Sequence, residues 1–139
     1  MSEFKWSKVR TGGLFSGVKV MIEFKFLRPI PDGEAQSITM YHDKQGRVLG
    51  MLEYEIRGKE CKIMVFSIQE WSTPKFAEKL IKEVFVVCKK NKAKLCKIEI
   101  YDTDNKTHDK LSIFKRLGFG IESGGNVTGY NQYHLIKKF

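Results

Sequence analysis

Carboxylates in the middle of the chain are the residues best suited to proton transfer. Glu53, Glu55 and Glu60 lie in stretches of alternating apolar residues, and Glu70 follows soon after. A carboxylate beside a bound substrate can accept a proton and so act as a general base. We select Glu55 and Glu60 as candidate catalytic residues. Each could equally be a solvated carboxylate on the outer face of a strand.

A second feature suited to chemistry is the stretch "SIQEWSTPKFAEKLIKEV", which predicts the end of a strand and then a helix from Pro74. Thr73 suits the N-cap position, and proline suits the first helical position. The first turn of a helix has unpaired amides and partial positive charge, so it can bind an anion. The hydroxyls of Ser72 and Thr73 and the ammonium of Lys75 would strengthen that attraction. The alternative is a plain capped helix start.

The cysteines give no sign of a metal site. Cys61, Cys88 and Cys96 are odd in number and form no C-x-x-C pair, and the three histidines are scattered. This spacing does not predict zinc binding, so we expect no metal. Free cysteines suit an intracellular chain, and the first ten residues lack the apolar core of a secretory signal. No long uncharged apolar run is present, so we expect a cytoplasmic protein without a membrane span.

The chain is strongly basic, with a formal net charge of +9 and a pI of about 9.5. Lysine supplies 20 of the 25 cations, and the densest run is "CKKNKAKLCK" at residues 88–97. These lysines could complement a helix dipole, or they could bind an anionic partner such as nucleic acid, a phosphorylated cofactor or an acidic protein. Base-specific DNA recognition relies more on arginine, and the five arginines are dispersed. Nucleic acid is therefore a partner that the composition allows but does not favour.

Period-two hydrophobicity predicts the strands that must position these residues. An N-terminal hairpin turns within "TGGLFSG", and "RPIPDGE" ends its second strand. A second hairpin turns at "DKQG", and a final hairpin turns at Gly124 and Gly125. Helices are predicted at residues 74–90 and 108–117, and the remaining strands include residues 61–68 and 94–101. The 139 residues therefore predict one α+β domain, with two main helices on a mixed, mostly antiparallel sheet of six or seven strands.

In this order of elements, residues 48–139 resemble the GNAT superfamily, the Gcn5-related N-acetyltransferases. "FSIQEWSTPKFAEKLIKEV" resembles the family's strand four, pyrophosphate loop and long helix, whose signature is Q/R-x-x-G-x-G/A. Ser72 falls at the Q/R position, Lys75 at the first glycine and Ala77 at the last position, so only Ala77 matches. "IFKRLGF" is similar to the family's "LYEKLGF", with Phe114 where a tyrosine is common. "DTDN" is similar to the family's asparagine-containing loop.

This resemblance implies acetyl-coenzyme A as cosubstrate. It implies a thioester aligned by the backbone of strand four and a diphosphate bound at the start of the following helix. Phe114 cannot protonate the departing thiolate as a tyrosine would, so Ser112, Tyr130 or water would have to do so. We expect Phe114→Tyr to be tolerated. The implied cofactor-binding residues are Phe66, Ser67, Ile68, Ser72, Thr73, Lys75, Phe76, Ala77, Asn105 and Phe114.

The N-terminal region, residues 1–46, departs from the family. Members usually carry one or two helices between their first two strands, whereas only "RPIPDGEAQ" separates them here. The resemblance therefore implies a reduced acceptor cleft. The function it implies for this single domain, residues 1–139, is acetyl-CoA-dependent N-acetylation of an unidentified amine, by a monomer or homodimer. The alternative is a non-catalytic GNAT-fold module that binds an anionic partner, such as nucleic acid or an acidic protein, through its basic surface.

Overall fold

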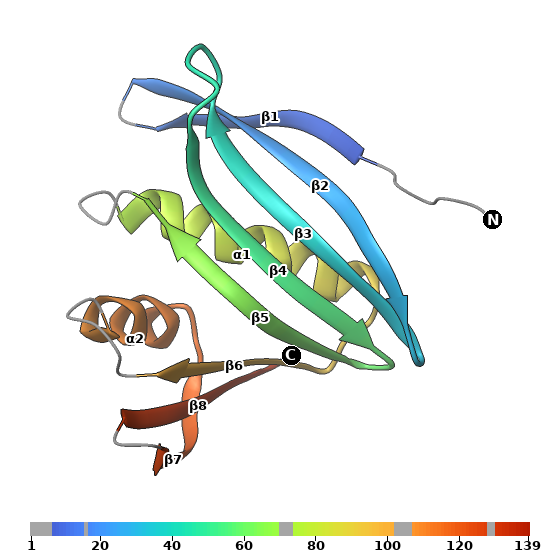
Figure 1. Ribbon diagram of the computed structural model, residues 1–139, viewed down its shortest axis with the longest axis vertical. Coiled ribbons are helices and arrows are strands. Elements are labelled where there is room, and N and C mark those ends of the chain that lie inside the picture. The colour runs from blue at the N-terminus through green and yellow to red at the C-terminus, as the bar shows by residue number, and fades with distance from the viewer. Residues whose placement is uncertain (1–6, 16, 70–73, 102–106, 128–129) are drawn as a thin grey trace.

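The computed structural model describes residues 7–15, 17–69, 74–101, 107–127 and 130–139. Within them, eight strands form one sheet in the order β1-β2-β3-β4-β5-β6-β8-β7 (Figure 1). All neighbours are antiparallel except β5 and β6, which run parallel. The predicted α+β class and mostly antiparallel sheet are confirmed, but the predicted six or seven strands are too few.

The first five strands form a meander of β1 (Ser7–Phe15), β2 (Val18–Ile30), β3 (Gly33–His42), β4 (Val48–Arg57) and β5 (Glu60–Ile68). The prediction that "RPIPDGE" ends the second strand early is wrong, because β2 continues to Ile30. Among the described residues the β1–β2 ladder begins at Ser7–Lys25, so Pro29, which has no N–H to donate, has no partner from that part of β1. β2 and β3 are joined directly through Pro31 and Asp32, and no helix intervenes.

The second half contains α1 (Pro74–Lys90), β6 (Leu95–Tyr101), α2 (Thr107–Arg116), β7 (Gly120–Val127) and β8 (Tyr130–Lys138). The helix predicted at residues 74–90 is confirmed, and the second predicted helix is shifted by one residue. The turn predicted at Gly124 and Gly125 is wrong, because both lie inside β7 and pair with Tyr133 and Gln132 of β8. Glycine signals a turn only where the chain reverses, and a strand can also contain it.

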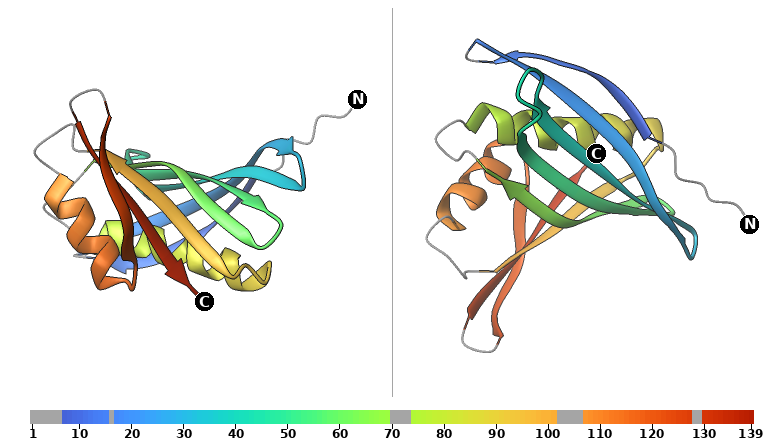
Figure 2. Two further views of the ribbon diagram at one scale, coloured as in Figure 1. Left: turned by 90° about the horizontal axis from the view of Figure 1, so that it is seen from below. Right: turned by 45° about the horizontal axis from the view of Figure 1, so that its top comes forward.

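Both helices lie on the same face of the sheet (Figure 2). Leu80, Ile81 and Val84 recur at helical spacing along α1 and are fully buried in one core with the sheet residues Ile38 and Leu52. An ion pair of 2.7 Å between Arg116 of α2 and Glu78 of α1 joins the two helices. No helix in the described part of the chain covers the opposite face, which we call the open face. None of the described helices is long and apolar enough to cross a membrane.

Candidate active site

The parallel strands β5 and β6 separate part-way along their length. Their ladder pairs Glu60 with Leu95 and ends where Ile63 pairs with Ile98. Beyond this point β5 continues to Ile68 and β6 to Tyr101, and the two strands diverge (Figure 1). The β4–β5 register skips Met64, since Glu53 pairs with Val65 and Tyr54 with Ile63. Met64 is therefore the extra residue of a β-bulge, and such a bulge bends its strand away from a regular course.

The divergence leaves a cavity of about 140 Å³ between β5, β6 and the start of α2. Ligands of parallel sheets bind at the carboxyl ends of the strands, where neighbouring connections diverge. This cavity has that position on the sheet's one parallel pair among the described strands. Its lining combines apolar and polar side chains, which are Met64, Phe66, Ile98, Glu99, Ile100, Tyr101 and Lys110.

Three phenylalanine rings form the apolar wall behind the cavity. The Phe66 ring, which lines the cavity, meets the Phe114 ring edge-on at 5.1 Å between centroids. Phe114 in turn meets Phe119 edge-on at 5.1 Å and is 0% exposed. The edge-to-face geometry is the favourable one for aromatic pairs. Phe114, which the resemblance predicts as a cofactor contact, thus lies one ring behind the surface that a ligand in the cavity would touch.

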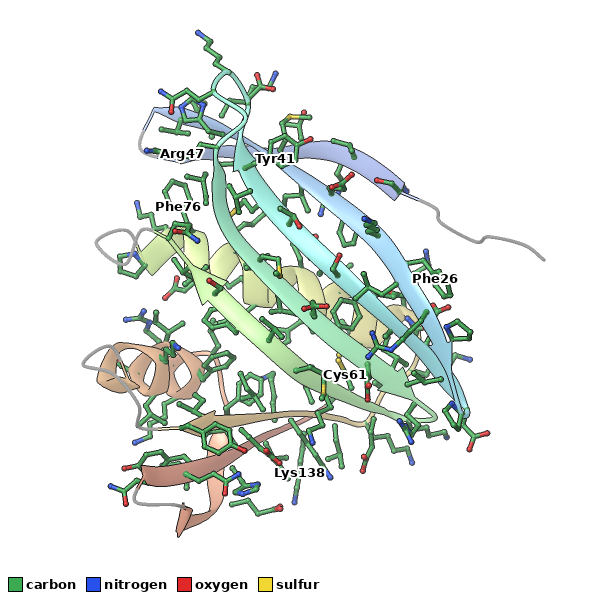
Figure 3. All side chains as sticks on the ribbon, viewed as in Figure 1. Phe26, Tyr41, Arg47, Cys61, Phe76 and Lys138 are labelled. Atoms are coloured by element: carbon green, nitrogen blue, oxygen red, sulfur yellow. The ribbon has the colours of Figure 1, made fainter. Side chains whose placement is uncertain are left out.

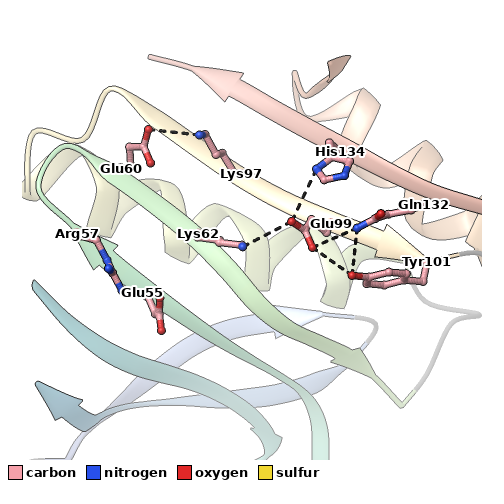
Figure 4. A network of polar contacts seen from close by, with 9 residues as sticks. All are labelled: Glu55, Arg57, Glu60, Lys62, Lys97, Glu99, Tyr101, Gln132 and His134. Carbon is pink, nitrogen blue, oxygen red and sulfur yellow. Dashed lines mark hydrogen bonds and ion pairs between the residues drawn. The ribbon is translucent and has the colours of Figure 1, made fainter. Parts of the chain in front are cut away.

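A polar network centred on Glu99 lies on the open face beside the cavity (Figure 4). A Glu99 oxygen lies 3.6 Å from Lys62 Nζ and 3.7 Å from His134 Nδ1. The other oxygen accepts hydrogen bonds from the Tyr101 hydroxyl at 3.2 Å and from Gln132 Nε2 at 3.4 Å. Gln132 Nε2 also donates to the Tyr101 oxygen at 3.1 Å. β5, β6 and β8 thus bring four polar side chains to the carboxylate of Glu99.

The two members of this network that line the cavity have complementary protonation chemistry. Tyr101 is largely exposed, and partial desolvation, the Glu99 charge and the hydrogen bond to Glu99 raise its pKa, so its phenol keeps its proton at neutral pH. Tyr101 is therefore a proton donor, whereas an ionised Glu99 only accepts. A proton acceptor and a proton donor on one wall of a cavity are the groups that general acid–base chemistry requires.

The predicted catalytic residues Glu55 and Glu60 lie away from this cavity. Glu55 forms ion pairs with Arg28 at 3.7 Å and Arg57 at 3.6 Å. Glu60 begins β5 and lies 3.3 Å from Lys97. Both belong to the end of the sheet where β5 and β6 are still paired. Both carboxylates form ion pairs at that end of the sheet, and a catalytic role for either stays a prediction.

The predicted cofactor-binding residues are partly gathered at the open end of the gap. Phe66, Ser67 and Ile68 form the end of β5, and α1 starts shortly after it. Lys75 is exposed in the first turn of α1, whereas Phe76 and Ala77 are buried (Figure 3 labels Phe76). For Phe76 and Ala77, only the backbone amides could therefore contact a ligand. Ser72, Thr73 and Asn105 lie outside the described residues.

Four residues of this network were not predicted from the sequence, namely Glu99, Tyr101, Gln132 and His134. A signal was present, because alternation in "KLCKIEIY" places Lys97, Glu99 and Tyr101 on one face of the predicted strand. What the sequence could not supply was the pairing of this strand with β8, which brings His134 opposite Glu99 and Gln132 opposite Tyr101.

A larger cavity of about 440 Å³ lies between α1 and strands β1–β3. Its lining includes Arg10 of β1 and Glu83 of α1, which form an ion pair, and Arg10 also lies 5.5 Å from the centre of the Phe24 ring. Lys79 binds the second Glu83 oxygen at 2.8 Å. These contacts hold the N-terminal hairpin against α1, and we therefore regard this cavity as a packing feature despite its size.

The sequence matches no protein-family model and no curated protein. Solved structures are similar to it in fold. An acetyltransferase from Bacillus cereus superposes with a TM-score of 0.65 at 14% identity, over 77% of this chain and 74% of that one. A protein assigned to the GNAT family of acetyltransferases from Desulfovibrio desulfuricans gives 0.63 at 13% identity, over 75% and 69%. PaiA N-acetyltransferase from Thermoplasma acidophilum, solved in complex with coenzyme A, gives 0.60 at 16% identity, over 76% and 61%.

The chain has the GNAT fold. The fold expected from the resemblance is thereby confirmed, and the low identities agree with a divergent sequence. The gap between β5 and β6 is the candidate binding site, and Glu99 and Tyr101 form its polar wall.

Proposed function

We propose that this protein is an acetyl-CoA-dependent N-acetyltransferase that acts on an amine. The observation that supports this most is the gap beyond Ile63 and Ile98, with its cavity and the Glu99–Tyr101 pair on the wall. The GNAT fold supports the same reaction class by analogy, because its structural neighbours are acetyltransferases.

In this proposal the thioester arm of acetyl-CoA lies in the gap beside the end of β5, at Phe66, Ser67 and Ile68. The diphosphate lies at the first turn of α1, where the amides of Phe76 and Ala77 and the exposed Lys75 ammonium provide positive charge. No acidic residue lies in the first turn of α1, so nothing there opposes an anion.

The amine approaches from the open face, since β2 joins β3 directly and no helix stands in the way among the described residues. Glu99 attracts the ammonium and accepts its proton, directly or through water. The neutral amine then attacks the thioester carbonyl, the carbon–sulfur bond breaks, and the thiolate takes a proton from Tyr101 or water. This mechanism replaces Glu55 and Glu60 with Glu99, because Glu99 lines the cavity and they do not.

A second candidate function is the binding of an anionic macromolecule without catalysis. It is favoured by exposed lysines gathered at the end of the molecule where α1 finishes. The Lys94 amide donates to the Lys59 carbonyl at 2.7 Å, which brings the β4–β5 turn next to the turn after α1. The exposed lysines of this basic end are Lys59, Lys89, Lys90, Lys92 and Lys94.

Release of free coenzyme A from acetyl-CoA, measured with a panel of amines, separates the two functions. The acetyltransferase proposal expects amine-dependent thiol release that falls in Glu99→Gln. Glu122→Gln, an exposed carboxylate on β7, is the matched control and should keep full activity. If no amine stimulates release while a nucleic acid or acidic protein binds in the low micromolar range, the second function replaces the first.

A further inference from the structure

Three cysteines that are far apart in the sequence meet inside the fold. Cys61 lies in β5, Cys88 in the last turns of α1 and Cys96 in β6. All three are free thiols and are 0% exposed, and their sulfur atoms all lie within 4.8 Å of one another. Cys61 and Cys96 are partners in the parallel ladder, and Cys88 reaches them from α1 (Figure 3 labels Cys61). The sequence spacing gave no indication of this cluster.

The cluster offers sulfur and no other ligand. No histidine or carboxylate joins the group in the part of the chain that the structure describes. The neighbouring Tyr54 hydroxyl donates at 2.5 Å to Gln36. Cys61 is paired with Ile56 on its other side, in the apolar core. An ion bound here would therefore have three sulfur atoms as its protein ligands, and the apolar surroundings would make a net charge on the complex unfavourable.

The distances allow three bonds to one atom. With a bond of about 2.3 Å, as in zinc–thiolate sites, the sulfurs of a flat three-coordinate site lie about 4.0 Å apart. Sulfurs already within 4.8 Å would need to close by at most about 0.8 Å to reach that flat spacing, and somewhat further for an ion that keeps a lone pair and binds its three sulfurs as a pyramid. A shift of this size requires adjustment of the side chains rather than a rearrangement of the fold.

Coordination number and charge then select the ion. Structural zinc takes four protein ligands, and its three-ligand sites keep an accessible water, which a sealed cluster does not provide. Three thiolates would leave zinc(II) with a net charge of −1 and copper(I) with −2, and burial of either charge is costly. A trivalent thiophilic ion gives a neutral complex with three thiolates and requires no fourth ligand.

We propose that Cys61, Cys88 and Cys96 form a binding site for a trivalent thiophilic ion of the arsenite type. Arsenous acid, As(OH)₃, would react with the three thiols to form three arsenic–sulfur bonds and release three water molecules. Each thiol proton leaves on one hydroxide, so the oxidation state of arsenic is unchanged. Hydrogen bonds from Cys61 and Cys96 lower the pKa of Cys88, and the hydrogen bonds among the thiols raise the pKa of Cys61.

Access to the cluster is through the end of α1. Cys88 is followed by only two further helical residues and then by the exposed turn at Asn91 and Lys92. Helix ends open locally at low free energy, so the last turn can admit the ion without global unfolding. Once bound, the ion would link β5, α1 and β6 at the paired end of the gap.

Sodium arsenite added to the reduced full-length protein tests this site. Native mass spectrometry should show one arsenic per chain, and X-ray absorption at the arsenic edge should count three sulfur neighbours. The melting temperature should rise, because the ion binds only the folded cluster. Zinc added under the same conditions should bind at least tenfold more weakly.

Cys88→Ala should weaken arsenic binding and leave at most two sulfur neighbours, with Cys88→Ser as a second variant if the alanine form does not fold. The spectroscopic count requires no variant, so it decides the matter even if both fail. No bound arsenic, or an arsenic atom with two sulfur and one oxygen neighbours, would overturn the three-thiol site. Zinc binding as tight as arsenite binding would overturn the charge argument.

Discussion

The substitution Phe114→Tyr tests whether Phe114 is a buried part of the aromatic wall or a residue that faces the cofactor. From the sequence alone, the resemblance predicts that an added hydroxyl is tolerated, since a tyrosine is common at this position. In the structure Phe114 is 0% exposed and packed between the rings of Phe66 and Phe119. This burial reverses the expectation, and we predict that Phe114→Tyr is destabilising.

The magnitude follows from the burial. A hydroxyl left without a partner in an apolar interior costs about 1–3 kcal/mol. For a chain of this length, each kcal/mol lowers the melting temperature by roughly 3–5 °C. Phe114→Tyr should therefore melt about 3–15 °C below the unchanged protein. Phe85→Tyr is the matched control, because Phe85 also contacts the Phe119 ring but is only half-buried. This variant should melt within about 2 °C of the unchanged protein.

The assay is thermal unfolding of both variants beside the thiol-release rate. A drop confined to Phe114→Tyr, with no gain in rate, supports a packing role. An unchanged melting temperature together with faster thiol release would refute the reasoning, because the hydroxyl would then have to reach the cavity.

Three further predictions concern the site, the turn chemistry and acid stability. In steady-state kinetics, Glu99→Gln should lower kcat roughly a hundredfold or more with little change in the KM for acetyl-CoA, whereas Glu60→Gln should keep most of the activity. A large loss of kcat in Glu60→Gln with a small loss in Glu99→Gln would instead support Glu60 as the catalytic residue. Gly33→Ala should lower the free energy of unfolding, measured by urea denaturation, by about 1–3 kcal/mol, because the new Cβ would lie 1.7 Å from the Ile56 carbonyl oxygen. Gly120→Ala should leave that free energy unchanged, because its Cβ would meet nothing within 4 Å. Burial raises the pKa of Glu83, but Arg10 and Lys79 outweigh it, so the folded-state pKa is lowered below the unfolded value. The stability that Glu83 adds is therefore fully present above a pH of about 4.3 and is lost as the pH falls through the folded-state pKa. Between pH 5 and 3 the unfolding free energy of the unchanged protein should fall more than that of Glu83→Gln. Equal losses in the two proteins would contradict a stabilising role of the ion pairs.

The sequence was sufficient for the elements with local signals. Helix α1 begins at Pro74 as predicted, because proline at the first helical position is a local signal and the apolar spacing is helical throughout. Buried and less buried residues alternate along most of β4 and along β6, as the period-two pattern predicts. The glycines at 124 and 125 misled the turn prediction, because their place in β7 depends on pairing with β8.

The candidate site was harder to predict, because it is built from contacts between distant segments. Glu99 is unremarkable in the sequence and becomes the centre of a network only through Lys62 on one neighbouring strand and His134 on the other. Convergence of the three cysteines likewise depends on the parallel pairing of β5 with β6 and on the packing of α1. No spacing rule reports such convergence, since each segment arrives through a separate tertiary contact.

Calorimetric titration with coenzyme A tests whether a cofactor binds in the gap with its diphosphate at the start of α1. We predict one site per chain, weaker binding in Lys75→Glu because a negative charge then faces the diphosphate, and unchanged binding in Lys138→Glu, at the end of β8. Absence of binding to the unchanged protein, or equal weakening by both substitutions, would contradict it.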